Sequence, residues 1–375
     1  MGMRQTTLIL LECRLRDSHA GPRVPLLWRH HASEIAAALS PLELVQVAGP
    51  EEAEAAAYDA AILGFNRIVA VGGSAVVHGL VNGAMRLADG HRRRMKIGFL
   101  SLGPRSAWAR AVGLPSALAR RLEILAAGHT LPYDVGRVEC LSPMVGAASG
   151  ATVSRYFLLG AACGPLSASW DLDGLPPLRL ARIAGSLVEA GGRCLTGRAP
   201  LVALEVDGTE VYRGPWALGQ VLGGRRYPFL GEADPQANLT EGTLNVAWIP
   251  AATVLGMAGR ALGLWLGGEL FPAPSRCQGQ EIRIVPLGEG APQTIEADGV
   301  PVGYLPATVR VLPRTLPVIV ESVAARVRER SRAAAELHPA ALAGSLRAVG
   351  LRRMSLSLHA LRRKLRRQPW APDSR

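Results

Sequence analysis

The chain has 375 residues, of which 49% are hydrophobic and only 5% aromatic, and its formal net charge is +12. This composition excludes a disordered chain and predicts two or three domains, each long enough to bury an apolar core. The charge is uneven, because residues 321–375 hold 13 Arg and Lys against 4 acids. Nine of the twelve surplus charges therefore lie in this tail, and the rest of the chain is close to neutral.

The cysteines are odd in number and scattered, with no Cys-x-x-Cys pair: Cys13, Cys140, Cys163, Cys194 and Cys277. This pattern argues against a disulfide scaffold and against a zinc site, so no metal centre is predicted. Free thiols indicate a reducing compartment and predict a cytoplasmic protein. The longest nearly uncharged stretch, residues 244–268, contains Pro250 and Arg260, and we interpret it as a buried strand plus helix rather than a membrane span.

Residues 1–128 alternate apolar strands with Ala-rich helices. The predicted strands are Thr7–Leu11, Leu44–Val47, Ile68–Val71 and Lys96–Leu100. The predicted helices are 50–64, 75–89 and 106–112. Such alternation predicts an α/β domain, with a doubly wound parallel sheet and helices on both of its faces.

From residue 129 to residue 320 the pattern changes to short strands separated by Gly, Pro and Asp-Gly turns, which predicts a β-rich antiparallel second domain. Its predicted strands are 152–159, 201–206, 244–249, 281–285, 294–297, 308–312 and 316–320, interrupted by helices at 178–190 and 252–266. We expect the last two strands to return toward the first domain. Residues 321–375 are predicted to form a basic helical tail.

The most informative local feature is the turn Gly72-Gly73, which joins the apolar strand ending at Val71 to an apolar helix. Glycines let a ligand approach the backbone closely, and the N–H groups and dipole of a helix N-terminus favour anions. The turn is therefore a candidate phosphate site. The residues that follow it, Ser74, Ala75 and Val76, supply no carboxylate for chemistry on a bound phosphate.

Further fragments follow this turn in a defined order. They are Asn82-Gly83, Gly103 to Arg110 with Gly113-Leu114-Pro115, Tyr133 to Gly136, Gly223-Gly224 with 233–246, and Ala297 to Val300. In order and spacing these fragments resemble the diacylglycerol kinase and sphingosine kinase superfamily of lipid kinases, over about residues 5–320.

This resemblance implies a fold and a site. The family has an α/β domain of the NAD-kinase and diacylglycerol-kinase type, which binds ATP and Mg²⁺, and a β-rich domain, with the lipid headgroup in the cleft between them. The residues that would contact the nucleotide here are Gly72, Gly73, Ser74, Ala75, Gly103 and Ser106. Asp298 and Asp134 are retained family acids and, with Glu241, are the candidate catalytic residues. Capping of turns explains either aspartate equally well.

Other family groups are missing at the matched positions. The turn Asp and Thr are replaced by Ser74 and Val76, the helix Glu by Gly79, and the Glu of the late Asp-Gly-Glu by Val300. The early Asn-Pro-x-Ser-Gly is replaced around residues 12–21. Phosphoryl transfer needs groups that neutralise the moving phosphoryl and orient the nucleophile. These departures predict a catalytically degenerate homologue that binds lipid or nucleotide in the cleft, and such a homologue would not require ATP and Mg²⁺ as cofactors.

Two other functions remain open. The first is an active ATP-dependent lipid kinase, which would require ATP and Mg²⁺ and act on a diacylglycerol-like or sphingoid hydroxyl. The second is a serine hydrolase that uses Ser74, since strand-Gly-x-Ser-x-helix resembles a nucleophile elbow. The final glycine of such an elbow is Val76 here.

The tail places Leu351, Met354, Leu358, Leu361 and Leu365 on one face of a helix, surrounded by Arg and Lys. A basic amphipathic helix predicts peripheral binding to an anionic membrane surface. The alternative is a solvated helix or one packed on a partner, including a second copy in a homodimer, because the spacing also fits a coiled coil. No specific nucleic-acid binding is predicted, since no aromatic residues interleave with the charges.

Overall fold

A computed structural model describes residues 4–13, 23–102, 114–143, 150–167, 199–223, 240–251, 275–288 and 292–322, with the short pieces 185, 192–193, 196, 226–227 and 231–232. The chain divides into two compact units, residues 1–320 and 321–375. The helices predicted at 106–112 and 252–266, most of the helix at 178–190, and the tail lie outside the described residues.

Four parallel strands form the first part of the sheet, in the order β2-β1-β3-β4. They are β1 (Arg4–Glu12), β2 (Leu42–Val47), β3 (Phe65–Val71) and β4 (Lys96–Leu100). Leu11 of β1 pairs with Val71 of β3, so the carboxyl ends of these two strands lie side by side. This register places the residue that follows Leu11 next to the glycine turn that follows Val71.

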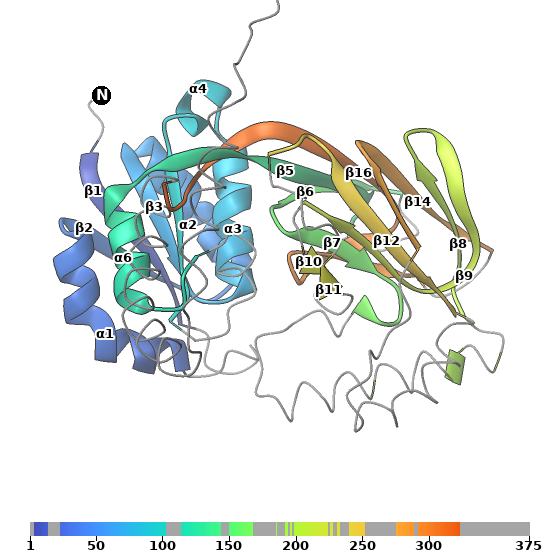
Figure 1. Ribbon diagram of the computed structural model, residues 1–375, viewed down its shortest axis with the longest axis horizontal. Coiled ribbons are helices and arrows are strands. Elements are labelled where there is room, and N and C mark those ends of the chain that lie inside the picture. Colours follow the sequence, from blue (N-terminus) through green and yellow to red (C-terminus); the bar gives the residue numbers. More distant parts are fainter. Residues whose placement is uncertain are drawn as a thin grey trace, which may run out of the picture. The chain divides into compact units, whose positions relative to one another are not determined.

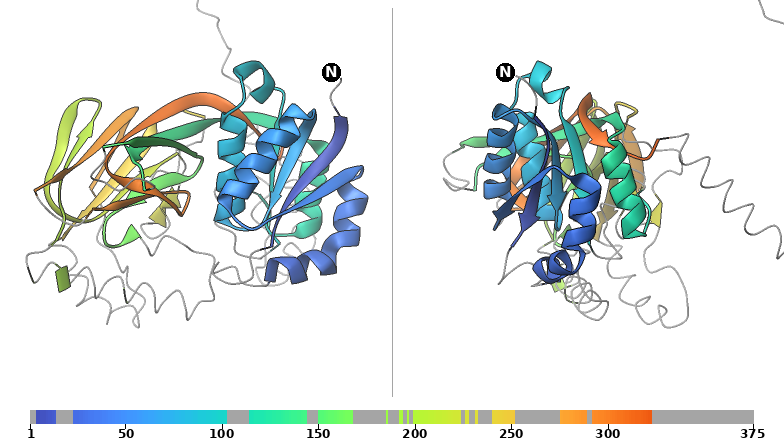
Figure 2. Two further views of the ribbon diagram at one scale, coloured as in Figure 1. Left: turned by 180° about the vertical axis from the view of Figure 1, so that it is seen from behind. Right: turned by 90° about the vertical axis from the view of Figure 1, so that its left-hand side faces the viewer.

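Helices cover both faces of these strands (Figures 1 and 2). Alternate residues of β1 and β3 face α2 (Pro50–Ile62) and α3 (Ser74–Met85) on one side, and α1 (Arg23–Leu39) and α6 (Leu118–Ala127) on the other. The sequence pattern did not predict α1 or α6. The helix predicted at 75–89 ends at Met85, and the short helix α4 (Asp89–Arg92) follows it.

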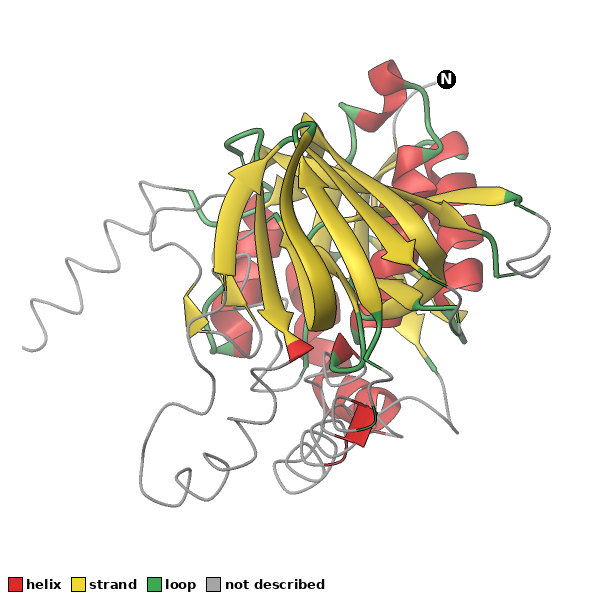
Figure 3. Ribbon diagram, turned by 90° about the vertical axis from the view of Figure 1, so that its right-hand side faces the viewer, coloured by secondary structure: helices red, strands yellow, loops and turns green. Residues whose placement is uncertain are grey.

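Antiparallel strands make up the second part of the fold (Figure 3). They are β5 (Thr130–Leu141), β6 (Thr152–Phe157), β7 (Gly160–Cys163), β8 (Leu201–Val206), β9 (Thr209–Leu222), β12 (Leu244–Pro250), β13 (Ser275–Gly279), β14 (Glu281–Leu287), β15 (Thr294–Ala297) and β16 (Val300–Ile319), with the separate pair β10 (Arg226–Tyr227) and β11 (Gly231–Glu232). Their core centres on the buried Trp216 and Phe157. The predicted mixed α/β chain with many antiparallel strands is confirmed.

Strand β16 links the two parts. It was predicted as two strands, but it is one strand with a register shift between Leu312 and Leu316. It pairs with β5 along its length, and Val318 pairs in parallel with Ile97 of β4, so both parts share one 14-stranded sheet. The domain boundary near residue 128 stays a prediction, because both sides belong to one compact unit. No helix among the described residues is long and apolar enough to cross a membrane.

Candidate functional site

The glycine turn lies where the sequence predicted it, between β3 and α3. Gly72 has a φ of 156°, Gly73 is the N-cap residue, and α3 begins at Ser74. The four predicted site residues Gly72, Gly73, Ser74 and Ala75 therefore stand together at a helix N-terminus. The first turn of α3 contains no acid, and no side chain of the cap residue satisfies its N–H groups.

A carboxylate from another strand occupies this turn. Glu12, the last residue of β1, accepts a hydrogen bond from the Gly73 N–H, with 2.6 Å between Oε2 and the nitrogen. Its side chain is almost completely buried, with 4% of the residue exposed. A hydrogen bond to a charged group stabilises by about 1.5–3 kcal/mol, and the helix dipole adds to it. Glu12 was not among the predicted site residues. The expected parallel pairing of β1 with β3 would have placed the end of β1 beside the glycine turn.

The turn fits closely around Glu12. A Cβ atom added to Gly72 would lie 2.5 Å from Glu12 Oε2 and 2.6 Å from Glu12 Cβ. Such distances are far below van der Waals contact, so only glycine fits at position 72. In a phosphate site, glycine lets the ligand approach the backbone closely. Here the Glu12 side chain of the same protein makes that close approach.

The position that corresponds to the family's helix glutamate is a packing glycine. A Cβ atom on Gly79 would lie 2.4 Å from the Pro50 carbonyl oxygen and 2.5 Å from Ala53 Cβ. Gly83, one turn further, is equally close to the Glu54 carbonyl oxygen, at 2.4 Å. Helix α3 thus packs on α2 at backbone distance along this face, and no carboxylate can be placed at position 79 without separating the helices.

Asp298 stands in the turn between β15 and β16 and is 2% exposed. Its Oδ2 accepts the Leu158 N–H at 3.0 Å, and its Oδ1 accepts the N–H groups of Leu159 and Gly160 at 2.8 and 3.1 Å. Burial raises the pKa of Asp298 to about 7, while the three backbone hydrogen bonds act in the opposite direction. Both carboxylate oxygens therefore hold the segment between β6 and β7.

Asp134 has a similar role in another place. It is 3% exposed, and its two oxygens accept the N–H groups of Gly242 at 2.6 Å and Arg314 at 2.7 Å. Arg314 has a φ of 51° and lies within the irregular part of β16, which this hydrogen bond holds in place. Glu241, the third catalytic candidate, is exposed beside Gly242. Asp134 and Glu241 thus meet at the segment around Gly242, whereas Asp298 holds a different segment, between β6 and β7.

An amide links α3 to the antiparallel strands. Asn82 Oδ1 accepts the Tyr156 N–H and Asn82 Nδ2 donates to the Tyr156 carbonyl, both at 3.0 Å. His78 Nε2 lies 3.2 Å from Asn82 Nδ2. Burial, and to a lesser degree the charge of Arg155, lowers the pKa of His78 to about 3, so the ring is neutral at pH 7. No hydrogen bond joins Ser74 to His78, so the hydrolase alternative finds no nucleophile and base pair among the described residues.

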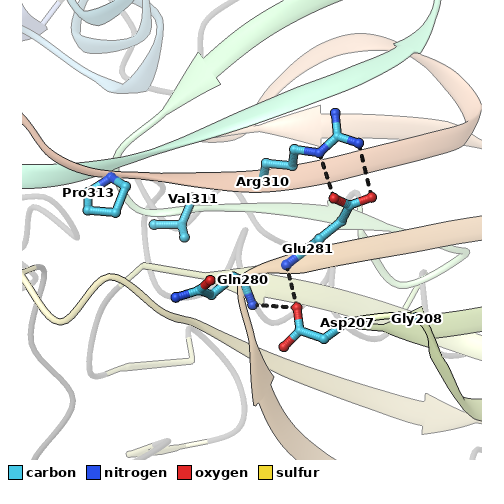
Figure 4. A pocket seen from close by; sticks show the side chains of 7 residues that line it. All are labelled: Asp207, Gly208, Gln280, Glu281, Arg310, Val311 and Pro313. Carbon is cyan, nitrogen blue, oxygen red and sulfur yellow. Dashed lines mark hydrogen bonds and ion pairs between the residues drawn. The ribbon is translucent and has the colours of Figure 1, made fainter.

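A surface pocket of about 550 Å³ lies elsewhere, on the antiparallel part (Figure 4). Its charged groups already have partners. Arg310 forms two hydrogen bonds of 2.8 and 3.0 Å to Glu281, and Asp207 Oδ1 accepts the N–H groups of Gln280 and Glu281. The charged groups that line the pocket are therefore already paired with one another or with the backbone. The pocket is the surface junction between two hairpin turns and β16.

The predicted site is only partly assembled by the described residues. Gly103 and Ser106 lie outside them. No hydrogen bond joins Ser74 or Ala75 to Asp298, and the interdomain cleft that the resemblance implies stays a prediction. ATP and Mg²⁺ fit the described residues poorly. Glu12 fills the turn, Gly79 has no space for an acid, and in the part of the chain described here no three His, Cys, Asp or Glu side chains cluster.

Comparison with known proteins confirms the resemblance predicted from the motifs. Residues 18–138 match the family model of the diacylglycerol kinase catalytic domain. A solved structure of a candidate diacylglycerol kinase from Bacillus anthracis strain Sterne is similar with a TM-score of 0.60 and 17% identity, over 84% of this chain and 97% of that one.

A crystal structure of a diacylglycerol kinase from the same organism is similar with a TM-score of 0.56 and 17% identity, over 85% of this chain and 98% of that one. At this identity the likeness establishes the fold. A search of curated proteins found no match.

Proposed function

We propose that this chain is a lipid-kinase-type protein of the diacylglycerol and sphingosine kinase superfamily that binds a lipid without phosphorylating it. Its parallel part corresponds to the doubly wound domain that holds ATP in active members, and its antiparallel part to their second domain. The fold of the similar structures and the match over residues 18–138 support this assignment.

The observation that carries the proposal is the environment of Asp298. This retained family acid accepts three backbone N–H groups and is 2% exposed. A general base must lie within hydrogen-bond reach of the proton that it removes, and a metal ligand must be accessible to the ion. Asp298 instead holds the chain between β6 and β7. Asp134 holds Gly242 and Arg314, which supports the same conclusion for the second retained acid.

A lipid is favoured over a nucleotide as the ligand. Two unit charges 4 Å apart repel by about 4 kcal/mol at the effective dielectric constant of a protein surface. A nucleotide phosphate at the glycine turn would meet the Glu12 carboxylate at such a distance and would compete with it for the Gly73 N–H. A neutral lipid headgroup meets no such repulsion.

Titration of the full chain with dioctanoylglycerol, in the absence of ATP and Mg²⁺, tests this function. We expect saturable binding in calorimetry with one site per chain. Dioctanoyl phosphatidic acid, which adds a phosphate to the same lipid, should bind more weakly because of the charge of Glu12. Failure of dioctanoylglycerol and of sphingosine to bind would contradict the lipid-binding function.

The tail supplies a second part of the proposal. A basic amphipathic helix over residues 340–375 would attach the protein peripherally to anionic membranes, where lipid ligands are found, in the cytoplasm. Free thiols support the compartment, because each of the four described cysteines is unpaired: Cys13, Cys140, Cys163 and Cys277. A second copy of the chain is the other partner that this helix would suit.

A further inference from the structure

The glycine turn already contains an anion. Leu11 of β1 pairs with Val71 of β3, and this register brings Glu12 beside the turn that follows β3. Glu12 Oε2 lies 2.6 Å from the Gly73 nitrogen. The position of the carboxylate oxygen relative to this N–H is the position that a phosphate oxygen takes at a helix N-terminus.

Two independent features show that the turn is shaped around this side chain. A Cβ atom at Gly72 would collide with both Oε2 and Cβ of Glu12. Helix α3, which is 12 residues long, has no acid in its first turn and no capping side chain of its own. The carboxylate that complements its dipole thus comes from Glu12, on a strand 61 residues earlier in the sequence.

A neighbouring thiol is also affected by this carboxylate. Cys13 follows Glu12 and is partly buried. Burial, and then the charge of Glu12, raises the pKa of the Cys13 thiol.

We propose that Glu12 is a built-in substitute for phosphate, which fills the anion position of the glycine turn and excludes phosphate-bearing ligands from it. This inference rests on the proposed function and gives a structural reason for it, because the Glu12 side chain occupies the position at which a nucleotide phosphate would bind. Without the Glu12 side chain, the turn would be a cryptic anion site whose ligands are phosphate or pyrophosphate groups.

Calorimetric titration of the full chain with pyrophosphate, without metal, tests the proposal in three variants. Glu12→Ala removes the blocking side chain, and Glu12→Gln keeps its size and a carbonyl acceptor but removes the charge. Glu52→Ala is the matched control, because Glu52 Oε2 also accepts a backbone N–H near a helix start, that of Ala48 at 2.8 Å, but at α2 and in an exposed place.

We expect no saturable binding to the wild-type chain or to Glu52→Ala. Glu12→Ala should bind pyrophosphate saturably, at least tenfold more tightly than the weakest affinity that the titration detects, and Glu12→Gln should bind with an intermediate affinity. Circular dichroism of each variant confirms folding, and the conservative Glu12→Gln keeps the test valid if the alanine variant is unstable.

Equal binding by wild type and both Glu12 variants would overturn the proposal, because Glu12 would then not block the turn. Absence of any gain in the folded Glu12→Gln and Glu12→Ala chains would overturn it as well, because the turn would not be an anion site. Lipid binding is measured in a separate titration, so failure of the proposed function and failure of this inference give different results.

Discussion

Buried carboxylates in this protein bind backbone N–H groups. Glu12, Asp134 and Asp298 are each at most 4% exposed, and each accepts at least one backbone hydrogen bond from a segment distant in sequence. A buried charge is tolerated only when hydrogen bonds compensate its lost hydration. Removing such a carboxylate is therefore expected to affect folding, whereas a catalytic acid would affect turnover while the fold persists.

His78 predicts a pH dependence of stability. Its pKa is lowered to about 3 in the folded chain, against about 6.5 when unfolded. Between these values the unfolded chain binds more protons, so the contribution of His78 is complete above pH 6.5 and is lost as the pH falls. The expected loss is about 2 kcal/mol between pH 6.5 and pH 5.

Urea denaturation of wild type and His78→Gln at several pH values measures this effect. The variant should lose less free energy of unfolding than the wild type over the same pH range. Asp298 acts with the opposite sign between pH 4 and pH 7, because burial raises its pKa to about 7, and it is unchanged in both chains. Identical pH slopes for the two chains would contradict a buried neutral His78.

Sequence patterns predicted the residues of the turn but not the roles of the acids. Asp298 is 138 to 140 residues from the N–H groups that it binds, so no local pattern could distinguish a catalytic acid from a backbone clamp. Glu12 was overlooked for a related reason. Its role depends on the pairing of β1 with β3, and the family motifs show only that the usual residues are missing there.

At the scale of elements, two glycines set the distance between α2 and α3. Gly79 and Gly83 are one turn apart on the face of α3 that meets the backbone of α2. This packing explains why the family's helix glutamate cannot be restored by one substitution. It also fixes the orientation of α3, whose N-terminus carries the turn and whose Asn82 holds Tyr156.

Gly79→Ala is expected to destabilise the chain although alanine favours helices. The new Cβ would lie 2.4 Å from the Pro50 carbonyl oxygen, a backbone atom that cannot rotate away. Overpacking of this kind costs about 1–3 kcal/mol. Gly90→Ala in α4 is the control, because no atom lies within 4 Å of the added Cβ. A loss of equal size in both variants, measured by urea denaturation, would contradict the proposed packing.

Short apolar strands were predicted well and long strands were not. The sequence indicated β1 to β4 because each is a short apolar run bounded by turn residues. It divided β16 at Pro313 and Arg314, where the strand continues through a register shift. Helices α1 and α6 were missed because α1 begins in an Arg- and His-rich segment and α6 carries adjacent arginines, Arg120 and Arg121, which hide their apolar faces.

At the scale of the whole molecule, the body and the tail differ in charge. Residues 321–375 carry nine of the twelve surplus positive charges and form the second compact unit. A chain without residues 340–375 should therefore lose salt-sensitive binding to vesicles that contain phosphatidylserine, while it still binds dioctanoylglycerol. Cosedimentation with neutral and acidic vesicles measures this. Equal binding of the truncated and full-length chains to acidic vesicles would exclude the tail as the membrane anchor.

The central claim is that the chain binds a lipid without transferring phosphate to it. The most direct measurement is a phosphate-transfer assay. The full chain, in molar excess over dioctanoylglycerol or sphingosine in mixed micelles, is incubated with γ-labelled ATP and Mg²⁺, and the labelled lipid is counted. We expect no more label than in a sample without the chain. The Ser74→Asp, Val76→Thr double variant should not restore full activity, since Gly79 and Val300 still stand where the family has acids. Mg²⁺-dependent labelling by the wild type above this background would contradict the proposed function, and its loss in a folded Asp298→Asn chain would assign Asp298 to the reaction.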